Sequence, residues 1–255
     1  MKLYVFTAKK LVANVLGVVA LIALVVMNYT HSESVFRGES VKELPIYCVD
    51  TQEKVCALSF DAAWGAEDTD TLIEILENYN AKATFFVVGD WVDKYPDAVK
   101  KLFKAGHDVM NHSNTHKYMT KIDNATLTNE VENCSDKIEK ITKKRPTLFR
   151  PPYGDYNSDV VKKLKSMGYN TIQWDVDSLD WKDLSAEEIY ARVTQKTKNG
   201  SIILFHNAAK NTPEALPKIL DKLKKDGYEF VKIEDMIYKD DYYIDNTGKQ
   251  IKNPN

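Results

Sequence analysis

Val55-Cys-Ala-Leu-Ser-Phe60 is an uncharged run that ends at Asp61. A short apolar run between charged residues is typical of a strand that is buried on both faces. The segment that follows, Thr69 to Asn80, carries apolar residues at helical spacing, and the next apolar run, Ala83 to Val88, predicts another strand. A strand, a helix and a second strand, all with a buried face, form the unit from which parallel sheets are built.

The same alternation continues to about Ile237. Further strands are expected at 108–111, 147–150, 169–174, 201–205 and 228–231, and further helices at 98–105, 127–142, 157–167, 185–198 and 213–226. About seven strands in one domain, residues 46–238, favour a barrel over an open doubly wound sheet. Residues 239–255 lack a core pattern and are expected to form a loosely held polar tail.

The N-terminal region has a separate pattern. Three lysines within the first ten residues precede an uncharged stretch from Leu11 to Met27, which is long enough for a short membrane-spanning helix. Basic residues on the N-terminal side keep that end in the cytoplasm. A cleaved signal peptide shares this pattern, but no small-x-small site follows Met27. We therefore expect residues 1–30 to be an uncleaved transmembrane helix and residues 31–45 a linker.

Either interpretation places the domain outside the cytoplasm, as a single-pass protein of the cell membrane or, if the segment is cleaved, as a secreted protein. The 35 basic and 37 acidic residues give a net charge of -2, so the chain lacks the basic excess of nucleic-acid binders. Of its three cysteines, Cys56 is expected to be a buried thiol. Cys48 and Cys134 can pair only if the fold brings their Cα atoms within about 7 Å, which the sequence leaves open.

Polar residues follow several of the predicted strands. They are Asp61, His112, His116, Arg150, Asp180 and His206. In parallel β/α folds the carboxyl ends of the strands meet at one edge, where active groups gather. The His-x-x-x-His spacing of His112 and His116 suits a divalent metal, because both imidazoles lie on one side of a helical turn.

Each of these residues also has an ordinary structural interpretation. Asp61 can cap the next helix, Arg150 can partner any carboxylate, and a single histidine such as His206 is often structural. If these residues were only structural, each of these separate explanations would have to hold at the same edge of the sheet. Their occurrence together therefore favours a shared function. The sequence therefore predicts a catalytic site with a metal at that edge.

The segments around these residues form five ordered motifs. They are Phe60-Asp61, His112-Ser-Asn-Thr-His116, Arg150-Pro-Pro-Tyr153, Asp177-Ser-Leu-Asp180-Trp181 and Leu204-Phe-His206. Together they resemble the motifs of polysaccharide deacetylases of the NodB-homology type, carbohydrate esterase family 4, over about residues 52–237. The resemblance implies a distorted (β/α)7 barrel. The form Phe-Asp-Ala-Ala-Trp-Gly, with the N-terminal anchor, resembles the sporulation-associated branch of that family.

The resemblance also implies a chemistry, in which a metal-activated water removes an acetyl group from a sugar of an N-acetylated cell-wall glycan. His112 and His116 would hold the metal, with Zn²⁺ the expected ion and Co²⁺ an alternative. Asp61 would be the general base that takes the proton of the water. Arg150 would keep Asp61 ionised and oriented.

The remaining motif residues complete this implied site. His206 would be the general acid that protonates the leaving amine, and Asp180 would orient it and raise its pKa. The backbone N–H of Tyr153 would help to stabilise the oxyanion. Trp181 and Leu204 would form apolar walls around the acetyl methyl group and the sugar.

The sequence departs from the family pattern at one position. The first motif of the family usually carries a second aspartate that is the third metal ligand, and here that position is Ala62. Asp61 itself, or Glu67 or Asp68, is the candidate replacement. A site with two histidines and no further anionic ligand is expected to bind metal more weakly.

Three functions remain open from the sequence. The first is an active metal-dependent deacetylase of peptidoglycan or a chitin-like oligosaccharide, which the retained acid, base and orienting residues favour. The second is a catalytically impaired family member that binds glycan, which Ala62 favours. The third is another barrel hydrolase, such as a metal phosphatase or amidase, but the second carboxylate cluster of a two-metal site is not evident. The sequence leaves the exact glycan and the oligomeric state open.

Overall fold

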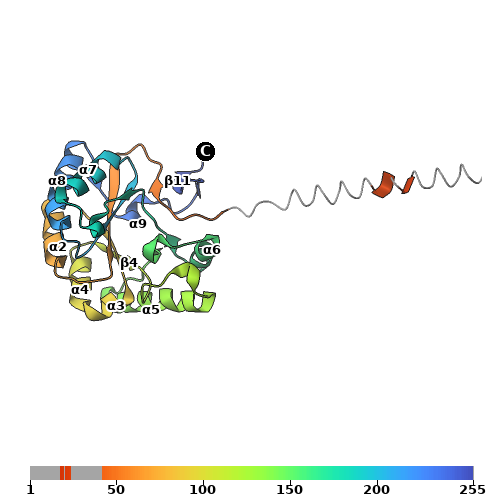
Figure 1. The fold of residues 1–255 in the computed structure, drawn as a ribbon, viewed down its shortest axis with the longest axis horizontal. Coiled ribbons are helices and arrows are strands. Elements are labelled where there is room, and N and C mark those ends of the chain that lie inside the picture. The colour runs from red at the N-terminus through yellow and green to blue at the C-terminus, as the bar shows by residue number, and fades with distance from the viewer. Residues whose placement is uncertain (1–17, 20, 24–41, 255) are drawn as a thin grey trace, which may run out of the picture. The chain divides into compact units, whose positions relative to one another are not determined.

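The computed structural model describes residues 18–19, 21–23 and 42–254 (Figure 1). The chain divides into two units, Met1–Lys42 and Glu43–Asn255. The predicted anchor at 1–30 and linker at 31–45 lie mostly outside the described residues, of which 18–19 and 21–23 are helical. Within the described ranges, no helix combines the length and apolar character needed to cross a membrane.

Seven parallel strands form the centre of the second unit, in the order β7-β8-β2-β3-β4-β5-β6. Their bounds are β2 Val55–Ala62, β3 Thr84–Val87, β4 Asp108–Asn111, β5 Leu148–Phe149, β6 Asn170–Thr171, β7 Val176–Asp177 and β8 Ser201–His206. Among the pairings of the described residues none joins β6 to β7, so the barrel is incompletely closed there. The short β9, Glu229–Phe230, pairs with the beginning of β2.

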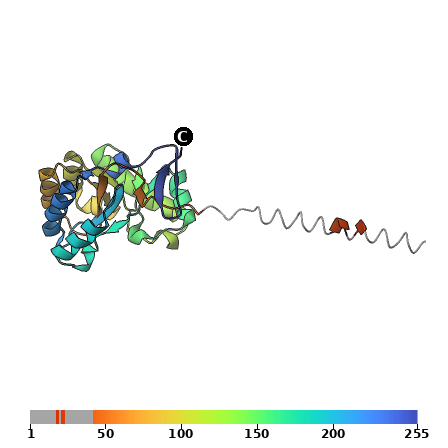
Figure 2. The same ribbon diagram turned by 90° about the horizontal axis from the view of Figure 1, so that it is seen from above.

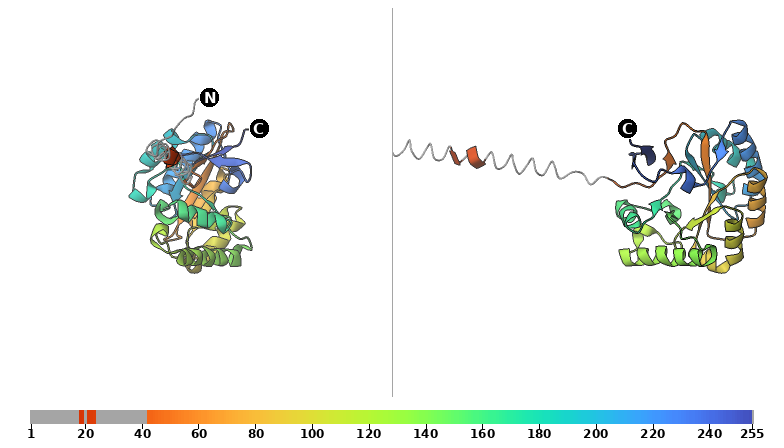
Figure 3. Two further views of the ribbon diagram at one scale, coloured as in Figure 1. Left: turned by 90° about the vertical axis from the view of Figure 1, so that its right-hand side faces the viewer. Right: turned by 180° about the vertical axis from the view of Figure 1, so that it is seen from behind.

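Helices cover the outer face of this sheet (Figure 1). They are α2 Thr69–Asn78, α3 Gly89–Lys94, α4 Pro96–Lys104, α5 Asn124–Thr142, α6 Ser158–Ser166, α7 Ala186–Lys196, α8 Thr212–Lys225 and α9 Ile233–Met236. The long helix α5 packs against α3 and α4, as Figure 3 shows from behind. The predicted alternation of strands and helices is thus confirmed, although α3 and α9 were not expected. The strand predicted at 169–174 is shorter, as β6, and β7 follows it where a loop was expected.

Side chains of β2 alternate between two environments. Phe60 and Ala62 belong to the apolar cluster between the sheet and its helices, where Phe60 stacks between Phe85 and Phe205 at centroid distances of 4.8 and 5.4 Å. Ser59 and Asp61 lie on the other face, where they contact Arg150. This alternation follows from the two-residue period of a strand.

The registers of the strands align their carboxyl ends. Asp61 lies beside His206 in the pairing of β2 with β8. Asn111, which precedes His112, lies beside Val87 of β3 and beside Phe149, which precedes Arg150. The polar residues predicted at separate strand ends therefore come from adjacent positions at one edge.

The C-terminal segment differs from the prediction. Instead of a loosely held tail, residues 239–255 contain the hairpin of β10, Tyr242–Ile244, and β11, Lys249–Lys252. β11 extends the sheet by pairing in parallel with β1, Cys48–Val49. Figure 2 shows the hairpin on the side of the sheet away from α2 and α8.

Polar contacts hold this hairpin, which explains why apolar periodicity does not reveal it. The fully buried Gln250 side chain donates to the carbonyl of Tyr238 and accepts from its N–H, both at 2.9 Å. Gly248 has a φ of +85° and lies so close to Tyr47 that a Cβ atom would be 2.2 Å from that ring. Only glycine fits this turn without strain.

The cysteines are all free. Cys48 is half-buried in β1 and Cys134 is buried in α5, where its thiol donates to the carbonyl of Val87 at 3.3 Å. The pairing of Cys48 with Cys134 that the sequence left open is therefore absent. Cys56 is a buried thiol, as predicted.

His107 predicts a pH dependence of stability. Its side chain is 2% exposed, and its Nδ1 accepts a hydrogen bond from the N–H of Ala83 at 3.2 Å. Burial, together with the positive charges of Lys82 and Lys232, lowers its pKa from 6.5 to about 4. Between these values the unfolded chain binds a proton here that the folded chain does not. The free energy of unfolding should therefore fall as the pH falls, by about 3 kcal/mol at pH 4.

Urea denaturation of the wild type and His107→Asn between pH 7 and 4 tests this expectation. Asparagine keeps a hydrogen-bond acceptor near the position of Nδ1 but does not titrate, so the difference between the two profiles isolates His107. Parallel profiles for the two proteins would contradict the assignment.

Candidate active site

A cavity of about 490 Å³ lies at the aligned strand ends. Seven of the nine predicted site residues line it: Asp61, His112, His116, Tyr153, Trp181, Leu204 and His206. The other two, Arg150 and Asp180, are fully buried behind it and contact Asp61 and His206 directly. The structure thus brings the predicted set together.

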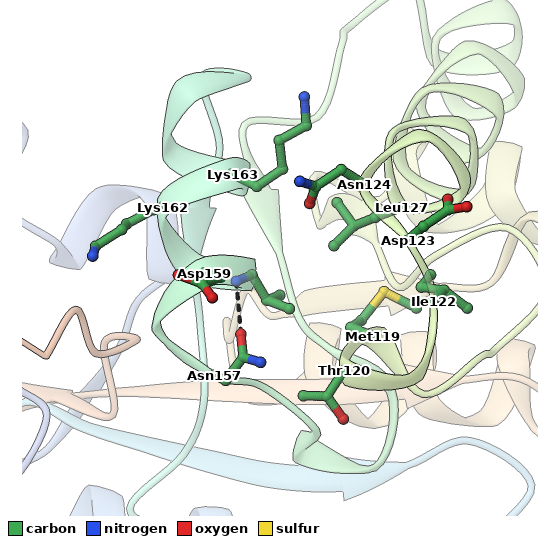
Figure 4. A pocket seen from close by; sticks show the side chains of 11 residues that line it. Met119, Thr120, Ile122, Asp123, Asn124, Leu127, Asn157, Asp159, Lys162 and Lys163 are labelled. Atoms are coloured by element: carbon green, nitrogen blue, oxygen red, sulfur yellow. Dashed lines mark hydrogen bonds between the residues drawn. The ribbon is translucent and has the colours of Figure 1, made fainter.

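Another hollow, of about 550 Å³, lies between the beginnings of α5 and α6 (Figure 4). None of the predicted site residues lines it. Its main polar contact is structural, because the Asn157 side chain accepts the N–H of Val160 at 2.9 Å and so caps α6. The chemistry of the motifs is confined to the first cavity.

Arg150 and Asp61 form a buried ion pair. An Nη of Arg150 donates to Asp61 Oδ1 at 2.8 Å, and the other donates to Ser59 Oγ at 2.9 Å and to the carbonyl of Gln173 at 3.2 Å. The guanidinium also lies 4.2 Å from the centre of the Phe86 ring. Burial alone would raise the pKa of Asp61, but the charge and hydrogen bond of Arg150 hold that pKa below its ordinary value. Asp61 is therefore ionised at neutral pH.

Asp180 fixes His206. One carboxylate oxygen accepts from His206 Nδ1 at 2.8 Å, and the other accepts from the backbone N–H of His206 and from Thr212 Oγ1, also at 2.8 Å. Because Nδ1 carries the proton, Nε2 is the nitrogen available to the cavity. Burial would lower the pKa of His206, but the hydrogen bond and charge of Asp180 raise it above its ordinary value. This arrangement favours a protonated imidazole that gives up its Nε2 proton.

His112 and His116 line the same cavity as Asp61 and His206. Nδ1 of His112 donates to the carbonyl of Arg150 at 2.7 Å, which leaves Nε2 at 3.5 Å from Asp61 Oδ2. The rings of His112 and His116 are 5.1 Å apart, and the buried Nδ1 of His116 has no hydrogen-bond partner in the described part of the chain. Burial lowers the pKa of both, to about 4 for His116. Neutral imidazoles with a free nitrogen are the form that binds a metal.

Among the described residues, neither Ala62 nor the carboxylates of Glu67 and Asp68 supply a third metal ligand. Ala62 is buried in the apolar cluster on the outer face of the sheet. Glu67 accepts the backbone N–H of Ala66, Asp68 accepts that of Ala208, and neither lines the cavity.

Within the described residues, no three or more His, Cys, Asp and Glu side chains are grouped so as to hold a metal ion. The residues that fit a metal are His112 and His116, with Asp61 as the adjacent carboxylate.

The loop that carries both histidines is held by α5. Glu130 of this helix is 5% exposed and accepts hydrogen bonds from the N–H of Asn114 at 3.0 Å, the N–H of Thr115 at 2.8 Å and Thr115 Oγ1 at 2.7 Å. Ser113 and His116 have positive φ angles of 66° and 59°. Such backbone strain persists only where surrounding contacts impose it. Glu130 holds the two residues between them, while Asn111 Oδ1 and Ser113 Oγ accept the N–H groups of Ser113 and His116.

The cavity has walls that the sequence analysis did not assign. They are Ala63, Trp64, Trp174, Asp177 and Asn207. The Asn207 side chain donates to the carbonyls of Trp64 at 2.8 Å and Gly65 at 2.7 Å, and so ties the loop after β2 to the loop after β8. Ala63, Trp64 and Asn207 directly follow the strands that end at predicted site residues, and this position in the sequence could have identified them. Trp174 lies between β6 and β7, and Asp177 is the last residue of β7. Which of them face the cavity depends on the course of the loops.

Replacement of Arg150 should lower the free energy of unfolding, and the size of the loss should depend on whether Asp61 is charged. Arg150→Met leaves the Asp61 carboxylate buried without its partner, which should lower the free energy of unfolding by about 3–5 kcal/mol. In the double variant Asp61→Asn/Arg150→Met no charge is left unpaired, so part of this loss should be recovered. Urea denaturation of the three proteins measures both effects. A double variant no more stable than Arg150→Met would refute the pairing.

Glu130→Ala should destabilise the histidine loop. Three partly buried donors would lose a charged acceptor, and we expect a loss of about 1.5–3 kcal/mol in the free energy of unfolding. Glu132→Ala on the same helix is the matched control, because its partly exposed ion pair with Arg145 is worth at most about 1 kcal/mol. Equal losses in the two variants would contradict a special role for Glu130.

Comparisons with known proteins agree with this geometry. The family model described as polysaccharide deacetylase matches residues 49–172. The peptidoglycan-N-acetylglucosamine deacetylase of Bacillus cereus is 37% identical over 194 residues, which cover 74% of this chain and 91% of that protein. The peptidoglycan-N-acetylmuramic acid deacetylase PdaC of Bacillus subtilis is 35% identical over 188 residues, 74% of this chain but only 40% of its own length.

Solved structures give the same result. The Bc1960 peptidoglycan N-acetylglucosamine deacetylase aligns with a TM-score of 0.73 and 29% identity, over 75% of this chain and 91% of that one. BA3943 of Bacillus anthracis, described as a family 4 pseudoenzyme, aligns with a TM-score of 0.73 and 33% identity, over 75% of this chain and 68% of that one. The incompletely closed barrel, the motif residues at one cavity and these relatives together establish that the chain belongs to the polysaccharide deacetylase family, carbohydrate esterase family 4.

Proposed function

We propose that this chain is a metal-dependent hydrolase that removes acetyl groups from the N-acetylated sugars of peptidoglycan or a chitin-like oligosaccharide. The observation that carries the proposal is that a general base and a general acid face the same cavity. Asp61 is held ionised by Arg150, and His206 is held with a raised pKa by Asp180. A base and an acid at the same cavity are what amide hydrolysis requires.

The chemistry follows from these positions. Asp61 takes a proton from water as the water oxygen bonds to the acetyl carbon, and Nε2 of His206 gives a proton to the sugar nitrogen as the C–N bond breaks. Acetate and a free amine are the products. Bound at His112 and His116, a divalent ion such as Zn²⁺, or alternatively Co²⁺, would polarise the acetyl carbonyl and lower the pKa of water.

Other groups would position the substrate. In this proposal the backbone N–H of Tyr153 donates to the oxygen of the acetyl group as negative charge develops there. Trp181 and Leu204, both at the cavity, exclude water from the acetyl methyl group and the sugar face. Named peptidoglycan deacetylases among the relatives support the choice of glycan.

A second candidate is a catalytically impaired member that binds glycan. Ala62 in place of the usual aspartate favours it, and the similar BA3943 protein is described as a pseudoenzyme. The orienting contacts of Arg150 and Asp180 favour the active enzyme, because binding alone does not need them.

The setting is part of the proposal. An uncharged stretch from Leu11 to Met27 behind basic residues supports an N-terminal membrane anchor, with the domain outside the cytoplasm where peptidoglycan lies. A secreted form is the alternative. The Phe-Asp-Ala-Ala-Trp-Gly form of the first motif supports a role in sporulation.

Acetate release by the full chain in detergent tests this function. The substrates are N-acetylated chito-oligosaccharides and peptidoglycan fragments, each with Zn²⁺, Co²⁺ or a chelator. We expect metal-dependent release, with Asp61→Asn slowed by about 10²–10⁴-fold and with both metal and activity lost in His112→Ala/His116→Ala. His107→Asn, a histidine far from the cavity, is the control and should retain activity. Full activity of the double variant would refute the metal mechanism. If the wild type binds no metal and releases no acetate from any substrate, the catalytically impaired, glycan-binding alternative would be favoured.

A further inference from the structure

Gln173 is a buried residue whose side chain the proposed chemistry does not use. It follows β6, is 2% exposed and does not line the cavity, whereas its neighbour Trp174 does. A buried amide is costly unless it forms hydrogen bonds, and Nε2 of Gln173 donates to the carbonyl of Gly154 at 3.2 Å. Gly154 directly follows Tyr153, whose N–H is the proposed oxyanion donor. The buried amide therefore contacts the turn that carries this donor.

This turn has a strained backbone. Tyr153 and Gly154 have φ angles of 59° and 66°, in the left-handed region that a bulky residue such as tyrosine seldom adopts. Within the turn, the N–H of Gly154 donates to the carbonyl of Pro151 at 3.1 Å. A Cβ atom on Gly154 would lie 3.3 Å from Gln173 Oε1 and 3.2 Å from the Trp174 ring. The Gln173 side chain thus packs directly against the turn, and such a conformation persists only where surrounding contacts impose it.

The backbone of Gln173 is itself held on two sides. Its N–H donates to the carbonyl of Ile46 at 2.8 Å, and the N–H of Ile46 donates to the carbonyl of Thr171 at 2.9 Å. Ile46 also forms an isolated parallel bridge with Ile172. The carbonyl of Gln173 accepts the hydrogen bond from the buried Arg150. The side-chain amide therefore extends from a fixed backbone, which makes its Nε2 a fixed point for the turn.

Gln250 shows what a glutamine with a purely structural role does in this fold. It is also buried, and its side-chain amide donates to and accepts from the backbone of Tyr238. Gln250 belongs to the C-terminal hairpin, none of whose described residues lines the cavity. The two glutamines make the same kind of contact, but only the partner of Gln173 belongs to a turn that carries motif residues.

We propose that Gln173 is a positioning residue for hydrolysis, whose amide holds the Tyr153–Gly154 turn in the conformation that directs the N–H of Tyr153 to the acetyl oxygen. This inference rests on the proposed function. Negative charge develops on that oxygen only in the transition state, so a displaced donor weakens binding of the transition state more than binding of the substrate. Loss of the amide should therefore lower kcat and leave KM unchanged.

The test compares Gln173→Met with Gln250→Met. Methionine has a similar length but no donor, and it leaves the backbone carbonyl of residue 173 in place for Arg150. Acetate release from the N-acetylglucosamine tetramer by the full chain with Zn²⁺ gives kcat and KM as a function of pH. We expect kcat to be about tenfold lower for Gln173→Met, with KM, bound Zn²⁺ and the pH dependence unchanged. Gln250→Met should match the wild type in all of these.

Three results of this comparison would overturn the inference. Equal kcat values for the two variants would show that the Gln173 amide is only structural. A higher KM with an unchanged kcat would place its effect on substrate binding. A shifted pH dependence would trace the loss to Asp61 through Arg150 instead of to Tyr153.

Hydrogen exchange tests the positioning apart from catalysis. In the full chain, the amide of Gly154 should exchange about fivefold faster in Gln173→Met than in the wild type, because one hydrogen bond no longer holds the turn closed. Gln250→Met controls for a loss of global stability and should exchange there more slowly than Gln173→Met. If no protein releases acetate but this difference is found, the proposed activity fails and the positioning of the turn by Gln173 stands. Equal exchange at Gly154 in all three proteins would overturn the inference.

Discussion

The buried contact between Arg150 and Asp61 is the interaction around which the site is built. A guanidinium with no exposed surface is costly to bury unless its donors are used. Here both Nη groups donate, to Asp61, Ser59 and the carbonyl of Gln173, while Nε has no partner among the described residues. Those partners come from β2 and from the segment after β6, on the inner face of the curved sheet. One side chain thus links opposite parts of the barrel and at the same time keeps the proposed base ionised.

The same arginine connects the base to the histidine loop. Its backbone carbonyl accepts the Nδ1 proton of His112 and so directs Nε2 toward Asp61. In the second catalytic pair, the Asp180 carboxylate likewise orients its partner. It accepts hydrogen bonds from both the backbone N–H and the Nδ1 of His206. In both pairs a fully buried group behind the cavity fixes the orientation and charge of a group that faces it. Such preorganisation is what a hydrolytic site needs before substrate arrives.

Several elements of this site were predictable because they obey local rules. The apolar run that forms β2 and the helical spacing of α2 predicted the strand and helix within two residues at each end. The parallel arrangement of the strands then predicts that Asp61, His112 and His206 lie at one edge of the sheet. The C-terminal hairpin was mispredicted, because it is held by Gln250 and by backbone pairing with β1 instead of by apolar periodicity.

The sequence by itself determined the order of strands and helices and the residues at the strand ends, since these depend on the period of apolar residues along the chain. Only the tertiary structure decided which loop residues face the cavity and that Ala62 lies in the apolar cluster. It also decided that Tyr118 stacks on Tyr153. These features depend on contacts between segments far apart in the chain. A local sequence pattern does not predict which loops come into contact.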